Sequence, residues 1–339
     1  MSRSLNRRSF AAGLGAAGVF AAMPKGFAQD STPSASPAAG DARVVSAANG
    51  EIEVTGTPQR IAAMEYELVE HLQTVGVTPA GVCERDSVNT WVNLPEPLGE
   101  DVVDLGTRDE PDMEAIIMLE PDLILAAHPR QDGFVEQLEG IATTVQLETY
   151  SPRFTPTGDE TSLDHAKGVL RGVAQATNTM DIAEQKITEF DTFIGACAGR
   201  LAQIGYEGQP YVYGSLIQSD SGTVNLFTDL SRIAGTITGL GLANAISLDE
   251  NPGSHFVEIS LEQIGTLPDD ILFFYSVSEA AVDQINETIE SDTWKAAGFV
   301  QNGGVIDLGS PNIWTAGGLI TMTDVINRVM MALEMRAHQ

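Results

Sequence analysis

Two stretches of the sequence repeat one pattern: Asp112-Met113-Glu114-Ala115-Ile116 leading to Asp122-Leu123-Ile124-Leu125, and Ser260-Leu261-Glu262-Gln263-Ile264 leading to Asp270-Ile271-Leu272-Phe273. The copies lie 148 positions apart, as the matched residues Glu114 and Glu262 show (262 − 114). Each copy begins with a residue type that caps helix N-termini and ends in an acid followed by an apolar run. A helix that leads into an all-apolar strand is typical of a parallel sheet covered on both faces. We therefore predict an α/β fold of two similar doubly wound lobes, with a ligand cleft between them.

One long helix is predicted between the two copies. Apolar residues recur at helical spacing from Met180 to Gln203, without strand patterns. A helix of about 24 residues is about 36 Å long, enough to cross from one lobe to the other. We expect an N-terminal lobe at 44–178, a connecting helix at 179–205 and a C-terminal lobe at 206–339. Because a single stiff helix joins the lobes, closure on a ligand should be small.

Strand and helix patterns alternate in both lobes, as in doubly wound sheets. A hairpin is predicted around Asn49-Gly50, a strong two-residue turn signal between strands at 43–46 and 51–54. Further strands are predicted at 58–64, 79–83, 101–105, 122–126, 210–213 and 305–308, and further helices at 66–75 and 319–335.

The N-terminus has the layout of an export signal. Arg7-Arg8 precede an apolar run from Ala11 to Met23 and a small-residue cleavage candidate at Gly26-Phe27-Ala28, which is typical of a twin-arginine signal over residues 1–28. An ordinary secretory signal after a chance arginine pair remains the alternative, and both predict an exported protein, periplasmic or at the outer face of the cytoplasmic membrane. The Ser/Pro/Ala-rich residues 29–43 predict a flexible linker.

The net charge limits the classes of binding partner, and the two cysteines raise the question of a disulfide. With 47 acidic against 18 basic residues, the formal net charge is −29, which argues against nucleic acid or an anionic membrane as a partner. Cys83 and Cys197 lie in different halves, and the sequence allows either a disulfide or two buried free thiols.

Candidate ligand residues follow the predicted strands, because ligands of open parallel sheets bind beyond the carboxyl ends of the strands. In the first lobe these are Arg85, Trp91, Arg108, His128 and Arg130, and in the second they are His255, Phe256 and Trp314. Tryptophan stacks on flat apolar faces and arginine offers five donors in a planar fork. The mixture predicts a bulky ligand with apolar faces and anionic or carbonyl oxygens. Each of the two histidines could equally be an ordinary polar loop residue without a ligand role. Trp294 is more typical of core packing.

Glu114 and Glu262 allow two interpretations. Each lies in the first turn of its helix, where the helix dipole favours an acid by about 0.3 to 1 kcal/mol, so neither needs a function. Their equivalence favours a second interpretation, in which a partner with two basic sockets contacts both lobes at once.

The segment from Val103 to Glu114, with Leu119-Glu120-Pro121-Asp122-Leu123-Ile124 downstream, resembles the periplasmic binding proteins of iron-siderophore ABC importers. Gly56-Thr57-Pro58-Gln59-Arg60-Ile61 is similar to the opening strand of that family, and Thr90-Trp91-Val92-Asn93-Leu94-Pro95 to its ferric-hydroxamate branch. The resemblance extends from about Val44 to Leu333.

This resemblance implies a transport protein that catalyses no reaction and needs no cofactor. Arg108 would contact the iron-chelating oxygens of a ferric siderophore, Trp91 and Trp314 would line the pocket, and Glu114 and Glu262 would dock onto arginines of the membrane permease. The protein, a monomer, would bind the organic shell rather than the metal and deliver the chelate to an ABC permease whose ATPase supplies the work.

Two other functions remain open. A protein of the same fold could bind haem, cobalamin or a metal ion, and direct capture of a metal ion or haem would use His128 and His255. An exported hydrolase is disfavoured because the sequence has no Gly-x-Ser-x-Gly elbow and no His-x-x-x-His pair.

Overall fold

The computed structural model describes residues 42–92, 94–149, 160–216, 223–246, 254–276, 282–309 and 317–338. The predicted export signal and nearly all of the predicted linker lie outside these ranges. No helix in the described ranges combines the length and the apolar character that crossing a membrane requires.

The N-terminal lobe is a five-stranded, all-parallel sheet in the order β5-β4-β3-β6-β7. Its strands are β3 (Ile61–Ala63), β4 (Gly81–Val82), β5 (Val103–Asp104), β6 (Leu123–His128) and β7 (Thr144–Glu148). Its helices are α1 (Tyr66–Thr74), α2 (Arg85–Trp91), α3 (Met113–Leu119) and α4 (Val135–Glu139). The chain leaves β3 toward β4 and β5 and returns to β6 on the other side. The order of the strands therefore reverses between β3 and β6, which makes this the switch point of the sheet.

The C-terminal lobe repeats that arrangement. Its parallel strands run β10-β8-β12-β13, which matches β4-β3-β6-β7 of the first lobe. These strands are β8 (Pro210–Ser215), β10 (Ala243–Asn244), β12 (Leu272–Tyr275) and β13 (Val305–Asp307). The helices are α7 (Arg232–Gly239), α8 (Leu261–Ile264), α9 (Val282–Glu290), α10 (Asp292–Ala296), α11 (Gly298–Gln301) and α12 (Leu319–Ala337). The predicted duplication is confirmed.

The C-terminal sheet also carries an antiparallel extension that the doubly wound interpretation did not predict. Strand β9 (Thr223–Phe227) pairs antiparallel with β8, and β11 (Phe256–Ser260) pairs antiparallel with β9. Burial alternates along β9, where Val224 and Leu226 are buried between partly exposed neighbours. This period of two is the sequence signal of a strand with one face buried.

The repeated stretches form the capped helices that they predicted. Asp112 accepts hydrogen bonds from the backbone N–H groups of Glu114 and Ala115, both at 3.0 Å, and Ser260 forms a capping box with Gln263. The second helix, α8, is only four residues long.

The predicted N-terminal hairpin forms, with its turn one residue earlier than expected. Strands β1 (Ala42–Ala47) and β2 (Gly50–Thr55) pair so that Ala47 lies opposite Gly50, which makes Ala48-Asn49 the turn. The Asn49 side chain accepts from the backbone N–H of Gln146 at 3.0 Å and donates to the carbonyl of Thr144 at 3.0 Å. Docking of Asn49 on β7 thus decides the register, and Gly50 tolerates the resulting φ of 116°.

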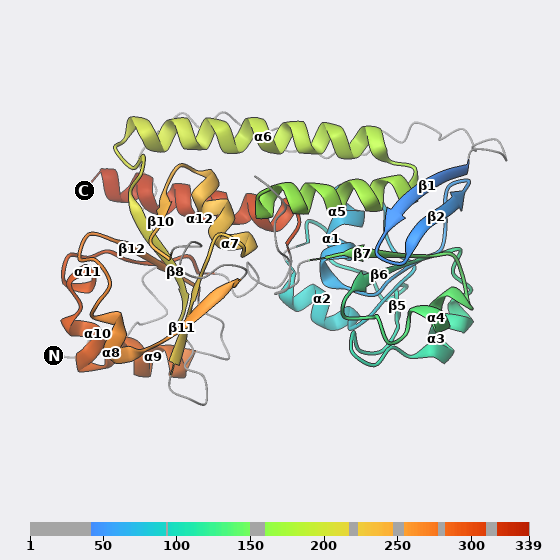
Figure 1. The fold of residues 1–339 in the computed structure, drawn as a ribbon, viewed down its shortest axis with the longest axis horizontal. Coiled ribbons are helices and arrows are strands. Elements are labelled where there is room, and N and C mark those ends of the chain that lie inside the picture. The colour runs from blue at the N-terminus through green and yellow to red at the C-terminus, as the bar shows by residue number, and fades with distance from the viewer. Residues whose placement is uncertain are drawn as a thin grey trace. The chain divides into compact units, whose positions relative to one another are not determined.

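A layer of helices links the lobes. The connecting helix α6 spans Met180–Gln203, as predicted, and lies along α5 (Ser162–Thr177) and α12 (Figure 1). Its buried face includes Ile187, Phe190 and Leu201, and one apolar cluster contains residues of α5, α6, α7 and α12. Since this cluster also reaches strands β8 and β12, the C-terminal lobe and the connecting helices share one core.

Helices α5 and α7 approach each other closely within this layer. A Cβ on Gly235 would lie 2.0 Å from the Ser162 hydroxyl oxygen, so a larger residue at Gly235 would push the helices apart. Cys83 and Cys197 are both buried free thiols, which decides against the disulfide.

Buried charges connect helix α1 of the first lobe to helices α7 and α12 of the second. Glu67 forms an ion pair with Arg232 at 3.1 Å, and the two side chains are 3% and 4% exposed. Arg232 also contacts Nδ1 of His165 at 2.9 Å, while burial and the Arg232 charge lower the pKa of His165 to about 4. One turn along α1, the fully buried Glu70 accepts from the N–H groups of Gly318 (3.1 Å) and Thr321 (2.6 Å). It thereby caps the N-terminus of α12 from another lobe.

Replacing Arg232 with alanine should destabilise the whole protein. The change removes the guanidinium from the buried Glu67 carboxylate, and breaking a buried ion pair in this way typically costs about 3 to 5 kcal/mol. Urea unfolding followed by circular dichroism measures the difference.

The matched control is Arg171→Ala, because Arg171 pairs with Glu184 at 2.6 Å while both side chains are more than 40% exposed. Removing an exposed pair should change the free energy of unfolding by about 1 kcal/mol or less. Equal losses in the two variants would contradict a special role for the buried pair.

Candidate functional site

The loop that follows strand β5 carries Arg108 to the carboxyl edge of the N-terminal sheet. Gly106 has a φ of 83°, and a Cβ there would lie 2.7 Å from the backbone nitrogen of Asp112. The loop therefore depends on glycine to fold back against the start of α3. The buried amide of Gln131 donates to the carbonyl of Arg108 at 2.8 Å and so fixes the backbone at this position.

The Arg108 side chain is enclosed by residues that follow β3 and β4. Its Nη1 donates to Oε1 of Glu65 at 2.8 Å, and its Nε lies 3.3 Å from Oε2 of Glu84. Its guanidinium carbon lies 3.7 Å from the centre of the Tyr66 ring, a cation–π contact. The Tyr66 hydroxyl donates to the Glu84 carboxylate. The side chain remains 23% exposed, so a ligand can reach it.

Arg130 joins the same cluster from the end of strand β6. Its Nε lies 2.8 Å from Oε2 of Glu65, and its Nη1 lies 2.6 Å from Oδ1 of Asp109. One carboxylate, Glu65, thus bridges both arginines. Because Glu65 follows β3 and Arg130 follows β6, the bridge lies at the switch point where ligands of such sheets bind.

Burial and neighbouring charges set the protonation states in this cluster. Burial works against ionised Glu84, but hydrogen bonds from Tyr66 and Arg108 outweigh it and lower the pKa of Glu84. Burial, together with the hydrogen bond to Glu84, raises the pKa of Tyr66 to about 12. Near neutral pH, Glu84 is an anion and Tyr66 a neutral donor.

The other predicted ligand residues of this lobe are placed differently. Arg85 donates to the carbonyls of Val102 (3.2 Å) and Glu100 (3.5 Å), so its side chain braces the loop before β5. Trp91 is partly buried and packs against the core of the lobe. His128 is 40% exposed and pairs with Asp132 at 2.8 Å.

In the C-terminal lobe, His255 is buried at 2% exposure, and Phe256 is 37% exposed at the start of β11. Trp314 lies outside the described residues. Glu114 and Glu262 are both exposed, as a contact with a partner requires. A hydrogen bond from Ser260 lowers the pKa of Glu262.

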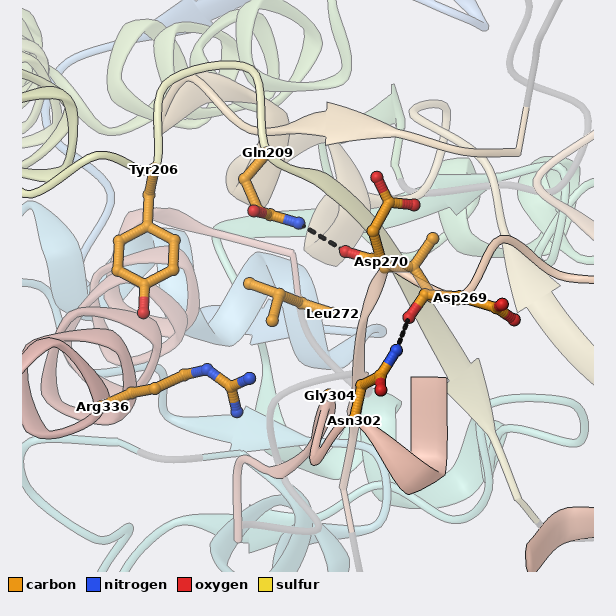
Figure 2. Close-up of a pocket in the computed structure, with 9 residues that line it drawn as sticks. Tyr206, Gln209, Asp269, Asp270, Leu272, Asn302, Gly304 and Arg336 are labelled. Atoms are coloured by element: carbon orange, nitrogen blue, oxygen red, sulfur yellow. Dashed lines mark hydrogen bonds between the residues drawn. The ribbon is translucent and has the colours of Figure 1, made fainter. Parts of the chain in front are cut away.

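A hollow of about 280 Å³ lies at the amino-terminal edge of the C-terminal sheet, opposite the carboxyl edge where a ligand is expected (Figure 2). Gln209, Leu272 and Gly304, which line it, lie at the amino-terminal ends of β8, β12 and β13. Figure 2 shows Gln209 and Asn302 donating to the carbonyls of Asp270 (2.7 Å) and Asp269 (3.0 Å). Ligands of open sheets bind at the other edge, so this hollow is not the predicted site.

The described ranges contain both histidines that a metal site would use, His128 and His255. Those ranges contain no group of three His, Cys, Asp or Glu side chains arranged to hold a metal ion.

Sequence reasoning found Arg108 and Arg130 but missed their partners Glu65, Tyr66 and Glu84. The sequence signal was available, because all three residues follow a predicted strand. Glu65 and Tyr66 come two and three residues after the end of β3, and Glu84 comes two residues after the end of β4. Glu84 also has a φ of 54°, which is uncommon for a residue other than glycine and often marks functional sites.

Comparison with protein-family models decides the family. Residues 61–311 match the model described as periplasmic binding protein, which covers more than half of the chain. The chain belongs to the periplasmic binding protein family. The family resemblance and the two-lobed fold predicted from the sequence are confirmed, and the protein is a binding protein, not an enzyme.

Relatives and solved structures agree with this assignment. The Fe(3+)-citrate-binding protein YfmC of Bacillus subtilis is 28% identical over 275 residues, 81% of this chain and 80% of the relative. The iron(3+)-hydroxamate-binding protein FhuD of Escherichia coli is 24% identical and covers 78% of this chain and 83% of its own length. The structure of FhuD from Vibrio cholerae with bound Fe3+–Desferal has a TM-score of 0.68 at 24% identity and covers 81% of this chain and 97% of its own.

Replacing Glu84 with glutamine should reduce stability in a pH-dependent way. The pKa of Glu84 is lower in the folded protein than its ordinary value of 4.5, so the ionised group stabilises the fold above that pH. As the pH falls below 4.5, the unfolded chain takes up a proton at Glu84 before the native carboxylate does, so this contribution is lost progressively until the pH passes the lower native pKa. Urea unfolding of both proteins from pH 7 to pH 3 should show a gap that narrows below pH 4.5, whereas a gap independent of pH would contradict the assigned charge state.

Proposed function

We propose that this periplasmic binding protein captures a ferric siderophore or a related iron(III) chelate outside the cytoplasm and delivers it to an ABC importer. The observation that supports this proposal most directly is the position of Arg108 and Arg130 at the switch point of the N-terminal sheet. Both side chains are partly exposed, and both are held by Glu65. Guanidinium N–H groups donate to the oxygens of an iron chelate, while the organic shell keeps the metal away from protein ligands. The relatives named as ferric citrate and ferric hydroxamate carriers support this ligand class.

Delivery requires a contact with a membrane permease, and Glu114 and Glu262 are the proposed contacts. They occupy equivalent positions, each two residues after the N-cap of its helix. Glu114 follows Asp112 on α3, and Glu262 follows Ser260 on α8. Both are exposed, and each lies in the first turn of its helix, where the helix dipole favours an acid. Two exposed carboxylates, one on each lobe, suit a permease with two basic sockets. Export across the membrane, through the proposed twin-arginine signal, belongs to the same proposal.

Titration with iron chelates tests the ligand class. Tryptophan fluorescence should be quenched by ferric desferrioxamine or ferric citrate, and not by zinc, manganese or haem. Arg108→Ala should weaken binding of the accepted chelate by about 1 to 3 kcal/mol, because it removes a partly buried charge-assisted hydrogen bond.

The matched control is Arg60→Ala. Arg60 precedes β3 at the opposite edge of the same sheet and pairs with Glu120 at 3.3 Å, with both side chains more than half exposed. Its loss should leave chelate affinity unchanged. Quenching by free metal or haem alone, or equal affinity in the Arg108 variant and the wild type, would contradict the proposal.

The double variant Glu114→Ala with Glu262→Ala should bind the chelate normally and fail to support its uptake, since only the permease contact is removed. Uptake of radioactive iron by cells that depend on this carrier measures the effect. The variant Glu136→Ala with Glu287→Ala removes the same number of exposed charges from two other helices, α4 and α9, and should transport normally. Normal uptake by the first variant would refute the docking role.

A further inference from the structure

The arginines of the candidate site are already paired with protein carboxylates. Glu65, Glu84 and Asp109 face Arg108 and Arg130, so three acids oppose two bases and the ionised cluster carries one net negative charge. Asp109 is 75% exposed, so solvent and salt screen its charge. Glu65 and Glu84 are 11% and 22% exposed and act at close range.

The pairing also restricts how the arginines can bind. A guanidinium holds a carboxylate best through two parallel N–H bonds, either from both Nη atoms or from Nε and one Nη. On Arg108, Glu84 lies at Nε and Glu65 at Nη1. On Arg130, Glu65 lies at Nε and Asp109 at Nη1. An incoming carboxylate that used two nitrogens would therefore have to share one with a protein carboxylate or displace it.

The donor that remains available on Arg108 suits a neutral oxygen of the ligand. The described residues place acceptors at Nε and Nη1 of Arg108 and none at Nη2, so a carbonyl-type oxygen of a chelate can accept from that single nitrogen. Such an oxygen brings no charge of its own against Glu65 and Glu84. A carboxylate in the same place would meet both acids at close range, where like charges repel strongly.

We propose that Glu65 and Glu84 form a charge filter, so that the site accepts ferric chelates of neutral or positive charge and disfavours those with negative charge or free carboxylates. This inference rests on the proposed function and refines it by naming the substrate class. Glu65 and Glu84 are positioning residues that act through the arginines.

The filter is built rigidly. The Glu84 oxygens accept from the backbone N–H of Arg108 at 3.0 Å and from the Tyr66 hydroxyl, while Glu65 accepts from the backbone N–H of Tyr66 at 2.8 Å. Each acid is thus held by a backbone N–H group as well as by an arginine, and neither can swing away when a ligand arrives without losing that bond.

The test uses one chelate in two charge forms. Ferric desferrioxamine B carries one positive charge on its terminal amine, and succinylation of that amine gives a complex of the same core with one negative charge. We expect the wild-type protein to bind the positive form at least tenfold more tightly. Glu65→Gln and Glu84→Gln should each reduce this ratio at least threefold, mainly by tightening the negative form, while ferric citrate should bind the wild type more weakly than either variant.

Glu110→Gln is the matched control, since Glu110 is exposed and lies two residues from Arg108. It removes the same charge from the neighbourhood without touching an arginine, and its ratio should stay within twofold of the wild type.

Three results would overturn the filter: a wild-type preference for the negative form or for ferric citrate, ratios that do not change in either glutamine variant, or an equal change in Glu110→Gln. Thermal unfolding establishes that each variant is folded, and if Glu84→Gln does not fold, Glu65→Gln decides. Failure to bind any ferric chelate would instead refute the proposed function itself.

Discussion

Helix α1 carries the interactions on which both the site and the joining of the lobes depend. Its N-cap, Glu65, bridges Arg108 and Arg130, and its first residue, Tyr66, packs on the Arg108 guanidinium. Glu67, in the same first turn, pairs with Arg232, and Glu70, one turn further along, caps the N-terminus of α12. Because these residues lie within six positions of one helix, a shift of α1 against the second lobe would also move the site.

Two contacts of different chemistry tie α1 to the C-terminal lobe. The Glu67–Arg232 pair needs its partner because an isolated buried charge is strongly unfavourable, and Glu70 satisfies N–H groups that α12 cannot pair internally. Together with the shared apolar core around α6, these contacts oppose a wide hinge motion. They give a physical basis for the small closure that a single connecting helix suggests.

The duplicated sheets differ in what they place at their carboxyl edges. In the first lobe, the loops after β3, β4, β5 and β6 bring two arginines and their acids together. In the second, the antiparallel strands β9 and β11 extend the sheet, and His255 is buried beside them. Equivalent backbones therefore carry different chemistry, and the described electrostatic features of the site belong to the N-terminal lobe.

The amino-acid sequence by itself determined the duplication, the parallel sheets, the bounds of α6 and the location of Arg108 and Arg130 after strands. These features follow from local periodicity, capping residues and glycine positions, which act over a few residues. Only the tertiary structure decided that the hairpin turns at Ala48-Asn49, that Arg85 braces a loop, and that Glu65 and Glu84 hold the arginines. Those outcomes depend on contacts between segments far apart in the chain, where docking on β7 overrides a turn preference and where the nearest carboxylate determines what an arginine can still bind.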